Sequence, residues 1–109
     1  MTHSGAPYYA VIFTTQRSEL DDGYADTARQ MLELAAKQEG FLGVETVREP
    51  SGLGITVSCW RDLDAIHRWR QNSAHLAAQQ AGREKWYTHY HVRICKVERE
   101  YDFEAEIEV

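Results

Sequence analysis

WYTHYHVRICKVEREYDF, residues 86–103, is the stretch that decides the fold of this chain. Aromatic, β-branched and polar residues alternate along it, which predicts one long strand from about Thr88 to Phe103. So long a strand is not left unpaired at the rim of a small domain, because unpaired edges invite association with other chains. We therefore expect it to be paired over its length, partly with a second copy of the chain.

The segments before this strand complete a β-α-β-β-α-β order. Strands are expected at Tyr8–Gln16, Phe41–Arg48 and Gly54–Trp60, and helices from Asp21 and Asp22 to about Gln38, from Asp62 to about Trp69, and from Ser73 to about Lys85. Gly40 is expected as the residue just beyond the first helix. This order predicts the ferredoxin-like α+β fold with an antiparallel sheet, in which the first strand lies between the third and the fourth.

The first strand is apolar on both of its faces. One face carries Tyr9, Val11, Phe13 and Thr15, and the other carries Tyr8, Ala10, Ile12 and Thr14. Helices cover only one face of such a sheet, so another surface must bury the second face. We expect the sheet of a second subunit there, which predicts a homodimer built as a dimeric α+β barrel.

The composition of the chain limits the kinds of binding partner and the cellular location that we expect. The chain has 109 residues and a net charge of −5, so we expect one domain over residues 8–103, with flexible termini at 1–7 and 104–109. The basic residues are dispersed, which disfavours nucleic-acid binding. With neither a leader pattern nor an apolar run of about 20 residues, we expect a cytoplasmic protein without a membrane partner. We also expect Cys59 and Cys95 to be free thiols, because the first strand should separate them.

Several local patterns together resemble a known family. They are Trp60 at the end of the third strand, AIHRW at residues 65–69, H-x6-G-x3-W-Y at His75, Gly82, Trp86 and Tyr87, and RICKVER at residues 93–99. Over residues 8–103 the chain resembles the antibiotic biosynthesis monooxygenase (ABM) domain of the dimeric α+β barrel superfamily. The resemblance implies a homodimer with a pocket between the helices and the sheet of each subunit.

The resemblance also implies a range of functions. Its members include oxygenases that oxidise anthrones or quinols with dioxygen and without metal or flavin, haem-degrading enzymes and small isomerase-like proteins. Haem-degrading members carry a helix His ten residues after the Trp that corresponds to Trp69, where this chain has Gln79. They also carry an Asn on the first strand, where this chain has none. We therefore expect no haem and no other cofactor, and a small aromatic or quinol-like substrate.

His75 is the candidate catalytic base, because an imidazole titrates near neutral pH. A structural alternative is a histidine near a helix start that makes a capping or interhelical hydrogen bond. The candidate substrate-binding residues are Tyr9, Phe13, Ser58, Trp60, Trp69, Trp86, His91 and Arg93. The tryptophans are equally compatible with an ordinary core, and we expect one of them to face the pocket.

Two further alternatives remain open. Arg93 either holds an anionic substrate oxygen or pairs with a carboxylate such as Glu98 or Glu100. His89 and His91 form a possible metal half-site, but no third ligand is evident, so no metal is expected. At the level of function, the alternative to an oxygenase is a non-catalytic dimer that binds a small molecule in the same cavity.

Overall fold

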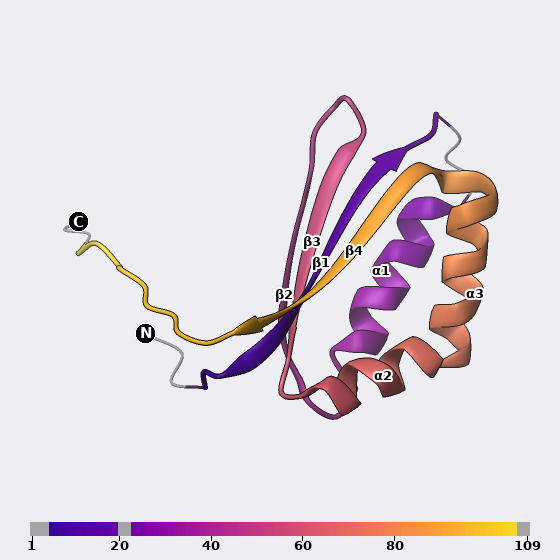
Figure 1. The fold of residues 1–109 in the computed structure, drawn as a ribbon. Coiled ribbons are helices and arrows are strands. Elements are labelled where there is room, and N and C mark those ends of the chain that lie inside the picture. Colours follow the sequence, from indigo (N-terminus) through magenta and orange to yellow (C-terminus); the bar gives the residue numbers. More distant parts are fainter. Residues whose placement is uncertain (1–4, 20–22, 107–109) are drawn as a thin grey trace.

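The computed structural model describes residues 5–19 and 23–106. The strands are β1 (Tyr8–Arg17), β2 (Phe41–Arg48), β3 (Leu53–Trp60) and β4 (Tyr87–Val97), and the helices are α1 (Tyr24–Ala35), α2 (Leu63–Gln71) and α3 (Ser73–Ala81), with a π-helical turn at Gly82–Trp86. All strand pairs are antiparallel, in the order β2-β3-β1-β4. The three helices lie on one side of the sheet, and no described helix covers the other side (Figure 1). This confirms the ferredoxin-like α+β fold.

The first three strands lie where the sequence predicts them, but the first helix ends earlier than predicted. The expected start of the first helix, at Asp21 and Asp22, lies outside the described residues. The helix ends at Ala35, so Gly40 is not the residue that follows it. Gly40 instead adopts a φ of 86° just before β2, where a Cβ atom would lie 2.6 Å from the Cβ of Ala65. Glycine is required there both by the left-handed backbone and by the close approach of α2.

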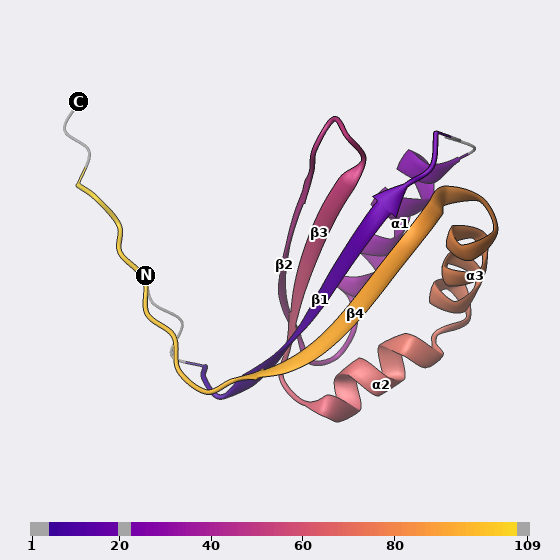
Figure 2. The same ribbon diagram turned by 45° about the horizontal axis from the view of Figure 1, so that its top comes forward.

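The last strand is shorter than predicted. β4 ends at Val97, the partner of Tyr8 at the start of β1, and residues 98–106 form no described strand. The prediction of a strand to Phe103 is therefore wrong for the single chain. The reason is that β1, the neighbour of β4 in the sheet, begins at Tyr8, and Pro7 before it has no backbone N–H to extend the pairing. The segment after Val97 runs away from the body of the domain in both views (Figures 1 and 2).

The core forms where α1 and α2 meet the sheet. Its buried members are Ala35, Trp60, Ala65 and Ile66. Trp60 is fully buried, and its indole nitrogen donates to the Ser58 hydroxyl oxygen at 2.9 Å. Burial of a Trp side chain of 150–250 Å² is the largest apolar contribution that one residue makes, so Trp60 anchors this end of the sheet.

Side-chain caps define the junctions around the second and third helices. The Asp62 carboxylate accepts from the Ala65 backbone N–H at 2.8 Å, as expected from the sequence, and begins α2. Asn72 accepts from the backbone N–H groups of Ala74 and His75 and begins α3. Such caps satisfy backbone donors that a helix start leaves free. No helix in the described part of the chain is long and apolar enough to span a membrane.

The two cysteines lie on either side of the first strand. Ala10 of β1 pairs with Cys59 of β3 on one side and with Cys95 of β4 on the other. Both thiols are free, as the sequence predicts from the strand order. Two strand spacings of about 4.8 Å separate them, beyond the ~7 Å that a disulfide allows between Cα atoms.

Candidate functional site

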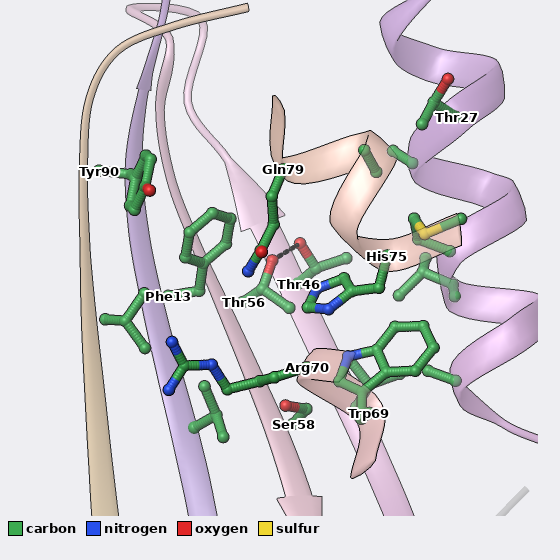
Figure 3. Close-up of a pocket in the computed structure, with 18 of the residues that line it drawn as sticks. Phe13, Thr27, Thr46, Thr56, Ser58, Trp69, Arg70, His75, Gln79 and Tyr90 are labelled. Atoms are coloured by element: carbon green, nitrogen blue, oxygen red, sulfur yellow. Dashed lines mark hydrogen bonds between the residues drawn. The ribbon is translucent and has the colours of Figure 1, made fainter. Parts of the chain in front are cut away.

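A cavity of about 340 Å³ lies between the helices and the sheet. Its size falls in the range of about 300–1,000 Å³ that is typical of small-molecule sites. Side chains from α1, α2 and α3 form one wall, and side chains from all four strands form the other. Figure 3 shows Trp69, Arg70, His75 and Gln79 on the helical side, with Phe13, Thr56, Ser58 and Tyr90 on the side of the sheet.

The structure brings most of the predicted site residues together. His75, Phe13, Ser58, Trp60, Trp69 and Trp86 all line the cavity. All three tryptophans therefore face it, whereas only one was expected to do so from the sequence. Trp60 belongs to the hydrophobic core and also forms part of the cavity wall, because its ring is large enough to contact both.

His91 and Arg93, two predicted substrate-binding residues, do not lie in the cavity. On β4 the cavity is lined by the residues between and beside them, Tyr90, Val92 and Ile94. Successive side chains of a strand point to opposite faces, so His91 and Arg93 lie on the sheet face away from the helices. Their placement there is a correction of the predicted site.

Tyr9 also lies outside the cavity lining. It is on the helical face of β1, two residues before Val11, and it packs against the core cluster that contains Trp60. It lies in the sheet opposite Trp60, beside that cluster, and is not among the residues that line the cavity. The structure therefore places Tyr9 in the core next to the cavity and not in the cavity lining.

His75 is held by stacking on the neighbouring helix. Its imidazole lies 4.4 Å from the Trp69 ring, centroid to centroid, at an interplanar angle of 21°. Trp69 in turn stacks on Trp60 at 6.1 Å and 26°. Three flat rings thus form a continuous stack that runs from the core to the cavity, and this stack fixes the orientation of the imidazole.

The environment of His75 favours the neutral imidazole. Burial is the main cause that lowers the pKa of His75, and the positive charge of Arg70 acts in the same direction, whereas the Trp69 carbonyl opposes them. Within the described part of the chain, the buried Nδ1 atom of His75 has no hydrogen-bond partner. A neutral imidazole at a cavity wall can take a proton from a bound molecule.

Several polar lining residues were not selected from the sequence, and three of them stand out by position. They are Arg70, Gln79 and Tyr90. Gln79 follows His75 by one helical turn, and Arg70 follows buried Ile66 by one turn on α2. The spacing of four residues from buried Ile66 would therefore have predicted that Arg70 faces the sheet. Gln79 and Arg70 both extend from the helices towards the sheet (Figure 3).

A polar network closes the cavity near the other end of the sheet. The Arg48 guanidinium donates to the Thr15 and Tyr24 hydroxyl oxygens at 2.9 and 3.0 Å, and the Tyr87 hydroxyl donates to that of Tyr24 at 3.4 Å. The Arg17 guanidinium lies 3.7 Å from the centre of the Tyr24 ring. Burial and the bond to Tyr24 raise the pKa of the Tyr87 hydroxyl, so it stays protonated. This network positions the rings of Tyr24 and Tyr87 at this end of the cavity.

Metal-ligating side chains do not gather in the structure as described. Among residues 5–19 and 23–106, no three or more His, Cys, Asp or Glu side chains come together to hold an ion. On the β4 face away from the helices, His89 and His91 stand opposite Gln16 and Thr14 of β1.

Sequence comparison identifies relatives of this chain. The family model for antibiotic biosynthesis monooxygenase matches residues 7–81. The uncharacterized protein YqjZ of Bacillus subtilis is 56% identical over 94 residues, which cover 86% of this chain and 82% of that protein. The jasmonate monooxygenase ABM of Pyricularia oryzae is 35% identical over 95 residues, 82% of this chain but only 43% of the fungal protein.

Solved structures show the same fold at low sequence identity. SnoaB, a cofactor-independent oxygenase from Streptomyces nogalater, superposes with a TM-score of 0.74 at 16% identity, over 87% of this chain and 97% of SnoaB. Rv0793 from Mycobacterium tuberculosis gives a TM-score of 0.76 at 13% identity, over 87% of this chain and 99% of that one. With the family model spanning more than half of its residues, the chain belongs to the antibiotic biosynthesis monooxygenase family.

Proposed function

We propose that the protein is a cofactor-independent monooxygenase that oxidises a small aromatic or quinol-like substrate with dioxygen. The observation that carries this proposal is the partly buried imidazole of His75, whose environment favours the neutral form, at the wall of an aromatic-lined cavity. The family supports an oxygenase, and so do the names of two similar proteins, a monooxygenase and a cofactor-independent oxygenase.

In the proposed reaction, the substrate is a phenolic ring ketone whose activated methylene group is oxidised by dioxygen. His75 removes one methylene proton, and the resulting carbanion gives one electron to dioxygen. The carbon radical and superoxide then combine into a C–O bond, and the imidazolium returns its proton to the peroxide. Loss of the second C–H proton with hydroxide leaves a carbonyl group. In sum, CH₂ and O₂ become C=O and H₂O, so no external reductant is needed.

Other lining residues have supporting roles in this proposal. The Ser58 hydroxyl accepts from the Trp60 indole, so its own proton is free to donate to a developing oxyanion. The amide of Gln79 offers a second donor from α3 (Figure 3). Phe13, Trp69 and Trp86 supply flat apolar surface for a planar substrate.

Oxygen uptake with anthrone is the direct test. The purified protein, without added metal or flavin, is expected to consume one dioxygen per anthraquinone formed and to release no hydrogen peroxide. His75→Ala should lower the rate at least ~10²-fold, the low end for loss of a general base. His67→Ala is the matched control, because His67 lies exposed on α2 and does not line the cavity.

The possible outcomes distinguish the role of His75 as the base from the oxygenase activity itself. A His75→Ala variant that keeps the wild-type rate would show that another group removes the proton. If anthrone stabilises the protein but no oxygen is consumed, the protein is a binding module that uses the same cavity. At a ligand concentration of a hundred times Kd, that stabilisation is about 2.7 kcal/mol.

We also propose that the protein acts as a homodimer joined through the uncovered face of its sheet. This face carries Val47, Leu53 and Ile55, which are 71%, 42% and 40% exposed in the single chain. Beyond β4, Tyr101 and Phe103 are 93% and 88% exposed on a segment that leaves the domain. Apolar side chains exposed to this extent mark a surface that another protein covers.

The beginning of this segment is already tied to the sheet. The Tyr8 hydroxyl donates to Oε1 of Glu100 at 2.7 Å, and this bond, followed by burial, raises the pKa of Tyr8 to about 12. Oε2 of Glu100 is buried and has no partner in the described chain, so a donor from a second copy would complete its bonding.

Light scattering during gel filtration tests the dimer. The full chain should elute at twice the mass of one chain at micromolar concentration, and Ile55→Glu should shift it to the monomer. Asp64→Asn, on exposed α2, is a control that should leave the mass unchanged. A monomeric full chain would refute the dimer but would leave the test of His75 unaffected.

A further inference from the structure

We propose that Arg70 anchors a carboxylate of the substrate, so that the cavity selects amphipathic acids whose flat apolar body lies inside and whose anionic group lies at the mouth. The inference rests on the proposed function, because it names the substrate class of the same cavity. It is carried by four observations: the position of Arg70, its free guanidinium, the charge of the cavity lining, and the apolar opposite wall.

Arg70 stands in the last turn of α2 and is exposed, yet it lines the cavity. Its side chain extends from the helix across the cavity towards Phe13 and the strands (Figure 3). A residue that is both exposed and part of the lining lies at the opening. An anionic group held there keeps contact with water, while the rest of the molecule is enclosed.

The guanidinium of Arg70 makes no hydrogen bond or ion pair to the residues that the structure describes. Two other arginines of this region do have an acidic partner, because the guanidinium groups of Arg68 and Arg61 lie 3.6 and 3.9 Å from the Glu39 carboxylate. Arg83, the other arginine of the lining, already donates to Gln80 at 3.0 Å and to Tyr90 at 3.3 Å. Arg70 thus retains its planar set of donors, which matches the two oxygens of a carboxylate.

The charge of the lining favours an anionic ligand. Among the described residues that line the cavity are two arginines, Arg70 and Arg83, and no Asp, Glu or Lys. A guanidinium without a carboxylate partner can pair with the carboxylate of a ligand through two parallel hydrogen bonds. In a chain with a net charge of −5, a cavity without carboxylates is a local reversal of the overall charge.

The surroundings of Arg70 suit the remainder of such an acid. Phe13, Val11 and Ile94 on the sheet and Trp69 on α2 provide apolar surface beside it. The Thr46 and Thr56 hydroxyls face the cavity but are bonded to each other at 2.8 Å (Figure 3). Most of the wall therefore offers dispersion contacts, and the charged end of the ligand is assigned to Arg70.

A pair of probes that differ only in charge tests the proposal. The probes are 2-naphthoate and its methyl ester, titrated into the wild-type protein while the fluorescence of the tryptophans in the cavity is followed. The acid is expected to bind at least tenfold more tightly than the ester. Arg70→Gln should weaken binding of the acid by about ten- to a hundredfold, as for loss of a charge-assisted pair, and leave the ester unchanged.

Arg68→Gln is the matched control, because it removes the same charge from the same helix without altering the cavity lining. It should change neither affinity, and Arg70→Lys should retain part of the preference for the acid. Thermal unfolding checks that each variant is folded, which the exposed position of Arg70 favours.

Three results would overturn the proposal. They are an unchanged affinity of Arg70→Gln for naphthoate, an equal loss for acid and ester, and no saturable binding of naphthoate to the wild-type protein at millimolar concentration. The assay involves no turnover. Preference for the acid without oxygen uptake would therefore support Arg70 as the anchor and reject the oxygenase activity. Oxygen uptake without a preference for the acid would reject only the role of Arg70 as the anchor.

Discussion

Acidification should destabilise this protein through His75 in a defined pH window. Burial lowers the pKa of His75 in the folded protein below the ordinary value of 6.5. Between these two pKa values the unfolded chain binds more protons than the folded one, so stability falls as the pH decreases through the window. The full contribution is present above pH 6.5 and is lost below the folded pKa. Within the window the slope is about 1.4 kcal/mol per pH unit.

His75→Gln removes this titration while keeping a polar side chain of similar reach. Urea unfolding curves, followed by tryptophan fluorescence at one fixed protein concentration, would be recorded at pH 7.5, 6.5, 5.5 and 5.0. The free energy of unfolding of the wild type should fall more steeply with acidification than that of His75→Gln, whereas exposed His67→Gln should follow the wild type. Parallel curves for the wild type and His75→Gln would show that the imidazole is not desolvated and would remove the basis for a neutral base.

Three other outcomes follow from the fold. Trp60→Ala, at a fully buried position, should cost about 3–5 kcal/mol in urea unfolding, whereas Trp60→Phe should cost less. Asp62→Ala removes the cap on the Ala65 N–H and should cost about 1 kcal/mol, with Asp62→Asn retaining most of the stability. Thiol titration of the unfolded, unreduced protein should count two free thiols, Cys59 and Cys95; a count of zero would contradict the strand order.

Local sequence patterns were sufficient for most of the fold. The run of β-branched and aromatic residues from Tyr8 to Gln16 predicts β1, and Asp62 ahead of a helical stripe predicts α2. Both depend on interactions within a few residues. The end of β4 depends instead on a distant neighbour, because pairing stops where β1 begins. No pattern within residues 86–103 contains that information.

The residues of the candidate site also fall into two groups, those that local spacing predicts and those whose position depends on strand pairing. His75 and Trp86 were found because helical spacing places them on one side, and the π-helical turn between them preserves this. His91 and Arg93 were chosen for their chemistry, but the pairing of β4 with β1 decides which face they occupy. Arg93 stands opposite Ile12, and the cavity is lined by the adjacent residue, Phe13. A single sequence shows the alternation of a strand but not which side meets the helices.

The proposed base and the proposed anchor depend on each other through charge. Proton transfer to His75 places a second positive charge near that of Arg70, which lines the same cavity and acts with burial to lower the pKa of His75. A carboxylate on Arg70 cancels this repulsion, so an anionic substrate makes His75 the better base, and an ester does not. The net charge of −5 does not oppose such a substrate at the site, since charges farther than ~8 Å are largely screened at physiological ionic strength whereas Arg70 lies in the cavity wall. Losses from Arg70→Gln and His75→Ala should accordingly combine non-additively for an acid and additively for its ester.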